Sequence, residues 1–188
     1  MSSILKVDQL QDSGGNEIIT SNGSGTITVN SQTFKNGITM VDQWRLSANT
    51  NAGTNADVTT NWERNDSTGY GSIGTGLTES SGIFSFPQTG IYWINYIGVT
   101  TTTTSDALIN YSLNITLDNS SYSQVSMMRN GNEGARNGTG SNSFLFDVTD
   151  ITNDKFKFVT ANFTSGTALR GNTTQQDTGF TVIRIGDT

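Results

Sequence analysis

The stretch Gly82–Val99 constrains the fold of this chain more than any other part of its sequence. It contains two apolar runs joined at a corner, where Pro87 has no amide proton for a strand ladder and Gly90 supplies backbone freedom. Side chains of the second run alternate between two faces of the expected strand, with Ile91, Trp93 and Ile97 on one face and Tyr92, Ile94 and Tyr96 on the other. Both faces are apolar. The run therefore predicts either a central strand of a β-sandwich whose tyrosine hydroxyls reach the surface, or a strand with one face at a subunit interface.

Three stretches of the sequence resemble the globular head of complement component q, the trimeric jelly roll related to tumour necrosis factor. Phe84–Tyr92 has the form Phe-x-x-Pro-x-x-Gly-x-Tyr, Ser143–Phe158 is similar to a hairpin of that family, and Gly179–Ile185 is similar to its closing strand. Asn153 stands where the family usually has glycine, and asparagine also accepts a left-handed backbone conformation. The resemblance covers residues 40–188. It implies a fold and a trimer without implying a chemistry.

Residues 40–188 are predicted to form an all-β head domain, an antiparallel two-sheet jelly-roll sandwich. No segment shows the i, i+3, i+4 spacing of apolar residues that is typical of a helix. The 21 glycines and 32% hydrophobic residues of the 188-residue chain are typical of an all-β protein with many turns. One face of the first expected strand of the head carries Met40, Asp42, Trp44 and Leu46. Asn130–Asn142 is predicted to be the longest loop, and Asn162–Thr178 is predicted to be a second polar loop.

Two sets of head residues are candidates for binding. The segment Phe180–Ile185, like the run after Gly90, is apolar on both faces, so we expect the threefold contact of the trimer at these two strands. The interface candidates are Tyr92, Ile94, Tyr96, Phe180 and Val182. The predicted loops form a polar, aromatic-bearing surface suited to glycans. The candidates there are Asn130, Glu133, Arg136 and Arg170.

The complete absence of cysteine and histidine excludes several classes of function. Without these residues the chain has no disulfide framework, no zinc–thiolate or imidazole metal site, and neither Ser-His-Asp nor Cys-His catalysis. Its ten Lys and Arg residues are scattered singly and its net charge is −6, which argues against a nucleic-acid partner. No hydrophobic stretch approaches the length of a membrane helix, and Met1–Asp8 lacks the apolar core of a signal peptide. We therefore expect synthesis in the cytoplasm and no membrane insertion.

Carboxylates are the remaining groups that could catalyse hydrolysis, and the candidate cluster is Asp147, Asp150 and Asp154. The preferred interpretation is that these are turn residues that bind their own backbone, in a wet setting that leaves all three ionised. A working catalytic pair needs one acid kept protonated by burial, so we expect no catalytic residues and a protein that is not an enzyme. Calcium binding at this turn stays open, because calcium needs only oxygen ligands and some members of the resembled family bind it. No other cofactor is expected.

Residues 1–39 are predicted to form an N-terminal attachment arm and neck. The pieces Ile4–Gln11, Glu17–Thr20 and Thr26–Val29 are β-like, but they are too short and polar to bury a core alone. They form either a floppy linker or an arm that folds by pairing with sister arms or a docking partner, and we favour the arm. The opening of the chain also resembles N-terminal segments of fibre-like structural proteins of tailed bacteriophages, particularly marine ones. This resemblance implies that the arm attaches to a phage capsid or tail.

Together these features predict a virion structural protein of a tailed bacteriophage. The hypothesis is a short trimeric fibre, spike or capsid-decoration subunit, made in the host cytoplasm and held on the particle surface by its arm. Its jelly-roll head would act in receptor binding, on a host-surface glycan, or would decorate the particle. Two alternatives come from other classes of protein: a tail-associated polysaccharide-cleaving enzyme that uses Asp residues, and a cellular adhesive or matrix protein.

Overall fold

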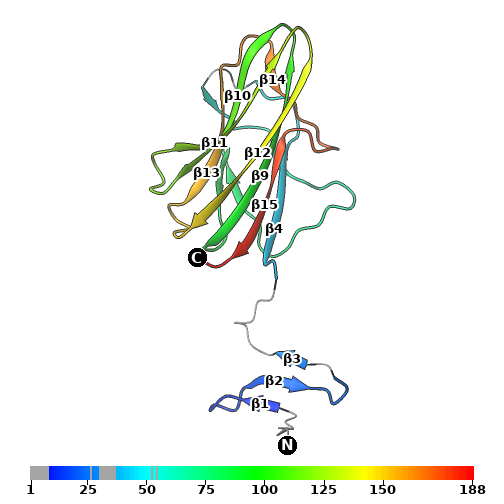
Figure 1. Cartoon of the computed structure of the whole chain (residues 1–188), viewed down its shortest axis with the longest axis vertical. Helices are drawn as coiled ribbons and strands as arrows, with labels where there is room; N and C mark the ends of the chain where they lie inside the picture. Colours follow the sequence, from blue (N-terminus) through cyan, green and yellow to red (C-terminus); the bar gives the residue numbers. More distant parts are fainter. Residues whose placement is uncertain (1–8, 26, 30–36, 52, 54) are drawn as a thin grey trace, which may run out of the picture. The chain divides into compact units, whose positions relative to one another are not determined.

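The structure, a computed structural model, describes residues 9–25, 27–29, 37–51, 53 and 55–188. The chain divides into two compact units, which we call the arm (residues 1–37) and the head (residues 38–188). The sequence analysis places this boundary after residue 39. Throughout the described residues the regular elements are β-strands, in agreement with the lack of helical spacing in the sequence (Figure 1).

The arm contains a small antiparallel sheet in the order β1-β2-β3. Its strands are β1 (Gln9–Gln11), β2 (Glu17–Ser21) and β3 (Ile27–Val29). Asp12 closes the first turn, because its carboxylate accepts hydrogen bonds from the backbone amides of Gly14 (2.8 Å) and Asn16 (2.9 Å). The side chain and the amide of Asn16 hold the pKa of Asp12 below its ordinary value. The β-rich character predicted for the arm is confirmed, and none of residues 9–25 is buried.

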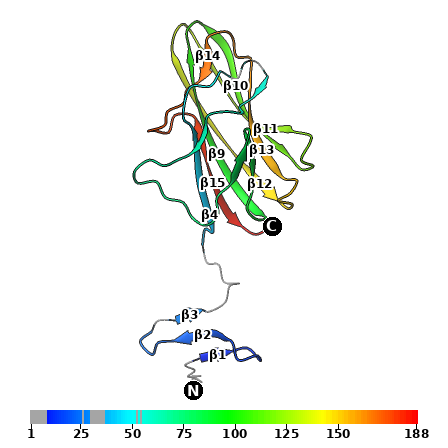
Figure 2. The ribbon, with the colours of Figure 1, turned by 180° about the vertical axis from the view of Figure 1, so that it is seen from behind.

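The head is a sandwich of two antiparallel sheets, as predicted (Figure 1, and from behind in Figure 2). The first, called the β9 sheet, has the order β12-β9-β15-β4-β6, and β14 also pairs with β9. Its strands are β4 (Met40–Leu46), β6 (Trp62–Arg64), β9 (Gly90–Thr102), β12 (Asn137–Val148), β14 (Thr167–Leu169) and β15 (Gly179–Gly186). The second, called the β10 sheet, has the order β11-β10-β13-β8-β7, and β5 also pairs with β13. Its strands are β5 (Ala56–Asp57), β7 (Thr78–Ser80), β8 (Ile83–Ser85), β10 (Asp106–Thr116), β11 (Ser123–Asn132) and β13 (Lys155–Ala161).

Aromatic side chains fill the space between the two sheets. The ring centroid of Phe84 on β8 lies 4.8 Å from that of Phe180 and 5.0 Å from that of Phe156. Full burial of one such side chain stabilises a fold by about 1.5–3 kcal/mol relative to exposure, and favourable ring pairs add about 0.5–1.5 kcal/mol each. This core supplies the stability that a chain without cysteine cannot take from disulfides.

The side chains predicted to form the subunit interface lie in this core. Tyr92, Ile94, Tyr96, Phe180 and Val182 are each no more than 1% exposed within a single chain. The strand register explains their burial, because Phe180 pairs with Tyr96 and Val182 pairs with Ile94, so β9 and β15 turn the same set of side chains inward. The interface prediction is therefore wrong about the face, since side chains buried within one subunit do not contact another.

The corner between β8 and β9 carries the chain from one sheet to the other, at the position that the sequence predicts. Gly90 begins β9 with a φ of 142°. A Cβ at this position would lie 2.4 Å from the Nε of Arg184 and 2.5 Å from the carbonyl oxygen of Gly186. Glycine is required here because both the backbone conformation and the available space exclude a side chain. The Nε of Arg184 donates a hydrogen bond to the carbonyl oxygen of Thr89 (2.8 Å), which ties the corner to the end of β15.

The segment predicted to be the longest loop, Asn130–Asn142, is mostly strand. β11 and β12 run through it, and only residues 133–136 form the connection between them. A Cβ on Gly140 would lie 2.3 Å from the Sδ of Met128, so the glycine lets Met128 pack directly on the backbone of β12. β11 and β12 are edge strands of different sheets, so the connection between them crosses from one sheet to the other at one side of the sandwich. The second predicted loop, residues 162–178, contains β14.

The head has two distinct ends along its strands. Met40 at the start of β4 pairs with Arg184 near the end of β15, so the head begins and ends at the same end of the sandwich, which we call the entry end (Figure 1). The connection between β9 and β10 and the connection between β11 and β12 lie at the opposite end, the free end. There the amide of Thr102 donates a hydrogen bond to the carbonyl oxygen of Arg136 (3.0 Å).

A chain that lacks residues 1–37 should fold as the full chain does. The buried hydrophobic residues of the core all lie in the head, so we expect the midpoint of thermal unfolding to shift by less than about 2 °C. Calorimetry of the two chains at equal concentration measures this shift. A chain that lacks residues 179–188, and with them β15, is the control and should not fold. An insoluble chain 38–188 would contradict the division into two units.

Candidate functional site

An apolar row crosses the outer face of the β9 sheet, the face directed away from the core. Trp93 on β9 pairs with Leu145 on β12 and with Ile183 on β15. Ile183 pairs with Val41 on β4, and Val41 is bridged to Ile73. Because directly paired residues in antiparallel strands point to the same face, these side chains form one continuous row.

Much of this row is exposed to solvent. Leu145 is 58% exposed and Ile73 is 46% exposed, whereas Trp93 is half-buried. Ile91 and Ile185 lie next to the row, toward the entry end, and Ile185 is 54% exposed. The apolar patch, as we call this surface, comprises Val41, Ile73, Ile91, Trp93, Leu145, Ile183 and Ile185. A contiguous exposed surface of this kind is typical of an interaction site, whereas apolar residues exposed singly are not.

Toward the free end the outer face of the same sheet becomes polar. Thr181 pairs with Asn95 on one side and with Gln43 on the other, and the Nε2 of Gln43 donates a hydrogen bond to the Oγ1 of Thr181 (2.9 Å). These side chains, together with Ile97 and Gln176, line a shallow hollow of about 300 Å³. The hollow offers amide and hydroxyl groups but no charge.

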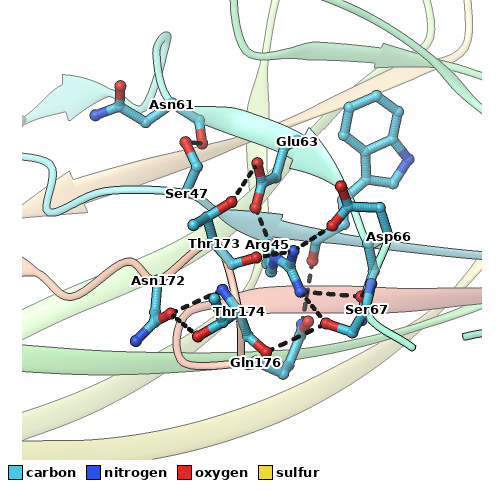
Figure 3. Close-up of polar contacts among 12 residues, drawn as sticks. Arg45, Ser47, Asn61, Glu63, Asp66, Ser67, Asn172, Thr173, Thr174 and Gln176 are labelled. Carbon is cyan, nitrogen blue, oxygen red and sulfur yellow. Dashed lines mark hydrogen bonds and ion pairs between the residues drawn. The ribbon is translucent and has the colours of Figure 1, made fainter. Parts of the chain in front are cut away.

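Arg45, the next outward residue of β4, is fully buried in a cluster of polar contacts (Figure 3). Its Nε donates to the Oε1 of Glu63 (2.7 Å), and its Nη1 donates to the Oγ of Ser67 (2.6 Å). Its Nη2 donates to the Oδ1 of Asp66 (2.6 Å) and to the carbonyl oxygen of Thr173. The planar guanidinium thus joins two segments, residues 63–67 and the segment that precedes β15, at one point.

An open groove of about 460 Å³ lies between these two segments. It is lined by Asp66, Ser67, Thr68, Thr173 and Thr174, and we call it the Arg45 groove. The Oγ of Ser67 donates to the carbonyl oxygen of Thr174 (3.3 Å), and the Oγ1 of Thr173 donates to the Oε2 of Glu63 (3.1 Å) (Figure 3). The two walls of the groove are therefore bonded to each other as well as to Arg45.

The sequence does not predict this cluster, although it contains one signal for it. Arg45 stands between Trp44 and Leu46 in a predicted strand, and a charge that is buried among apolar residues must find polar partners. The partners themselves carry no such signal, because Thr173 lies 128 residues further along the chain.

Asp42 is a second buried charge on β4 and lies on the inner face. Its two carboxylate oxygens accept hydrogen bonds from the Nε (2.9 Å) and the Nη2 (3.1 Å) of Arg64. They also accept hydrogen bonds from the hydroxyl of Tyr70 (3.1 Å) and the amide of Leu77 (2.8 Å). Burial and the neighbouring Asp42 raise the pKa of the Tyr70 hydroxyl. Asp42 thus fixes the segment between β6 and β7 to the inner side of β4.

The predicted surface-binding residues do not form one site. Glu133 and Arg136 are exposed in the connection between β11 and β12, whereas Asn130 is half-buried within β11. Arg170 follows β14 and forms an ion pair with Asp177 (2.9 Å between Nε and Oδ2). Of the four predicted residues, only Glu133 lines the hollow of about 560 Å³ at the free end. The lining of this hollow is Ser105, Ala107, Gly131, Asn132 and Glu133. No aromatic side chain belongs to it, so the expected aromatic-bearing surface is not formed there.

The acidic residues Asp147, Asp150 and Asp154 flank the turn between β12 and β13. The Oδ2 of Asp154 accepts hydrogen bonds from the amides of Thr149 (2.8 Å) and Asp150 (2.9 Å). The Oδ1 of Asp150 accepts one from the amide of Thr152 (2.8 Å), which lowers the pKa of Asp150. The interpretation as turn residues that bind their own backbone is confirmed for Asp150 and Asp154. The expected wet setting is wrong for Asp154, which is only 2% exposed.

This turn shows neither the expected backbone conformation nor a group of metal ligands. Asn153 does not have a positive φ, so it does not use the left-handed conformation that asparagine tolerates. Among the residues that the structure describes, no three carboxylate side chains are grouped so that they could hold a metal ion. In the same part of the chain, no helix has the length and apolar character needed to cross a membrane.

Comparison with known proteins shows a fold but not a family. No protein-family model and no curated protein matches the chain. Among solved structures, Eiger TNF from S. frugiperda is similar with a TM-score of 0.59 and 11% identity, over 81% of this chain and 96% of that chain. Murine APRIL at pH 5.0 is similar with a TM-score of 0.57 and 10% identity, over 78% of this chain and 98% of that chain. The vertex protein P5 of PRD1 has 20% identity over 80% of this chain and 99% of that chain, but its TM-score of 0.48 is too low to support an argument. The head is therefore a TNF-like jelly roll, as predicted.

Arg45→Met should destabilise the head by about 1–3 kcal/mol, because it leaves the carbonyl oxygen of Thr173 and the partly exposed carboxylate of Glu63 without their shared donor. Urea unfolding followed by tryptophan fluorescence measures the change. The control is Arg129→Met, at an exposed position of β11, which should change stability by less than about 0.5 kcal/mol. Equal unfolding midpoints for the two variants would show that the Arg45 cluster does not hold the two segments together.

Proposed function

We propose that the head associates into a homotrimer through the apolar patch and forms the projecting part of a phage structural protein. The observation that carries this proposal is the exposure of Leu145, Ile73 and Ile185 on a sheet whose inner face is already filled by its own core. Burial of apolar surface contributes about 25 cal/mol per Å², so covering this patch favours association.

Further copies of the same chain are the partners that suit the patch. The seven residues of the patch are uncharged, and an exposed carboxylate, that of Asp147, lies at its edge because Asp147 pairs with Ile91. Identical patches can therefore meet without like charges within the patch itself. Closed cyclic symmetry is the usual arrangement of identical subunits. The TNF-like fold and the sequence resemblance to the trimeric complement-q head support three subunits rather than two.

We propose that the arm attaches this trimer to the capsid or tail of a tailed bacteriophage, at the surface of the virion. The resemblance of the opening residues to fibre-like phage proteins supports this role, and so does the division of the chain into two units. The head then meets the host surface, and its ligand is a host-surface glycan.

The protein is proposed to bind this glycan without cleaving it. Of the acidic residues singled out in the sequence, Asp150 and Asp154 have their carboxylates engaged by backbone amides of their own turn. A glycosidase needs one carboxylic acid kept protonated near neutral pH. The hydrogen bonds at Asp150 lower its pKa, whereas a catalytic acid of this kind needs a raised pKa.

Leu145→Asp should dissociate the trimer and leave the fold of each subunit intact. Leu145 is largely exposed within one subunit, so the carboxylate becomes costly only when a neighbouring copy removes it from water. Analytical ultracentrifugation at micromolar concentration measures the change in mass. Leu117→Asp, at a position 64% exposed and outside the patch, is the control and should remain trimeric. A monomeric wild-type protein would contradict the proposal. Tyr96→Asp, in contrast, should unfold the subunit, because Tyr96 lies in the core.

Incubation with capsular or cell-wall polysaccharide of a host should release no reducing ends. The physical reason is that hydrogen bonds lower the pKa of Asp150, whereas a glycosidase needs one carboxylic acid whose pKa is raised. A reducing-sugar assay over time, with a known glycosidase as the positive control, measures release. Release by the wild-type protein that is lost in Asp147→Asn or Asp154→Asn would replace the binding role with an enzymatic one.

A further inference from the structure

We infer that the Arg45 groove is the subsite that holds a neutral sugar through its hydroxyl groups. This inference rests on the proposed glycan-binding function and names the place where the sugar is bound. It assigns the site to the two segments joined by Arg45, in place of the predicted residues Glu133 and Arg136.

The groove is built before any ligand arrives. Arg45 is 0% exposed and donates to Ser67 on one wall and to the backbone of Thr173 on the other. A second bond across the groove joins Ser67 to the carbonyl oxygen of Thr174. Both walls are bonded to the same buried side chain, Arg45. A ligand therefore does not have to order these segments, and binding avoids the entropic cost that flexible binding loops carry.

The polar groups that line the groove are mainly hydrogen-bond acceptors, so they suit a ligand that donates hydrogen bonds. The side chain of Asp66 is 81% exposed, and an ionised carboxylate only accepts hydrogen bonds. The hydroxyl hydrogens of Ser67 and Thr173 are already donated to acceptors within the protein. The Ser67 oxygen also accepts from Arg45, so what is left for a ligand is the Thr173 oxygen and one lone pair of the Ser67 oxygen. Sugar hydroxyls are suitable donors, and hydrogen bonds from them to Asp66 are of the stronger, charge-assisted kind.

The charge of the cluster favours a neutral ligand over an anionic one. The carboxylates of Glu63 and Asp66 outnumber the single guanidinium of Arg45, so the groove has an excess of negative charge. An acidic sugar would be repelled at this site. The volume of about 460 Å³ lies in the usual range of small-molecule sites, about 300–1,000 Å³, and accommodates a single sugar unit of a longer chain.

The groove and the proposed trimer contact use different parts of one face. Along β4 the outward residues are Val41, which belongs to the apolar patch, then Gln43, and then Arg45, which holds the groove. The patch lies toward the entry end and the groove toward the free end. A trimer formed through the patch therefore leaves the groove open to a ligand.

The experiment uses the full chain with methyl glycosides of mannose, galactose, glucose and rhamnose as probes. Saturation-transfer NMR identifies the glycoside that binds, and titration gives its dissociation constant. Asp66→Asn keeps the shape of the side chain and an acceptor for Arg45, but it removes the charge and should weaken binding about tenfold to a hundredfold. Thr68→Val changes a groove residue outside the Arg45 contacts and should weaken binding about threefold to tenfold. The matched control is Asp57→Asn, a 45% exposed carboxylate paired with Lys157 on the other sheet, which should bind as the wild type does.

Each outcome decides between the groove and the wider proposal. If the wild-type protein binds a glycoside and both groove variants bind it equally well, the groove is not the subsite, whereas the glycan-binding function stands. If no neutral glycoside binds at concentrations up to about 10 mM, where even millimolar affinities are detected, both the subsite and the glycan-binding function fail. If Ca²⁺ alone binds and Asp66→Asn abolishes this binding, the groove is a cation site and the sugar inference is wrong.

Discussion

The head depends on the aromatic core between its two sheets. Phe84 packs against rings from both sheets, with Phe156 and Phe158 from the β10 sheet and Trp44 and Phe180 from the β9 sheet. Phe180 in turn pairs with Tyr96, so the face of β9 that carries Tyr96 turns toward the same core. Once Tyr92, Ile94 and Tyr96 face the core, Ile91, Trp93 and Ile97 necessarily face outward. The apolar patch is thus a consequence of the way in which the core is filled.

The sequence predicts the sandwich and its central corner, but not which face of β9 is inside. Both faces read as apolar when Ile91, Trp93 and Ile97 are compared with Tyr92, Ile94 and Tyr96. Asn95 indicates which face of β9 is outside, because it is polar, shares a face with Trp93 and is exposed. The deciding information is the register with β15, which places Phe180 and Val182 beside Tyr96 and Ile94. Such long-range pairing cannot be read from periodicity within a single strand.

The other errors also arise from contacts between distant residues. The Gly- and Asn-rich composition of Asn130–Asn142 predicts a loop, yet Gly140 lies within β12, where it lets Met128 pack on its backbone. The Arg45 cluster shows the same limitation. Its loops are polar and contain few large apolar side chains, so a buried guanidinium takes the place of an apolar core in fixing them. Arg45 itself, a charge within a predicted strand, is the member of the cluster that the sequence could have indicated.

Strand β4 carries two buried charges of opposite sign, one on each face of the sheet, and each holds neighbouring segments in place. On the inner face Asp42 holds Arg64, Tyr70 and the amide of Leu77, and on the outer face Arg45 holds residues 63–67 and the segment before β15. Buried ion pairs rarely contribute more to stability than apolar side chains of equal volume, so their effect is better described as positional. Arg45 keeps two polar segments toward the free end of the outer face, whereas Asp42 holds the segment from which Ile73 reaches the apolar patch. In the proposed trimer, neighbouring copies would cover the entry end of this face and leave the free end open, so the proposed assembly and the proposed ligand would use different surfaces.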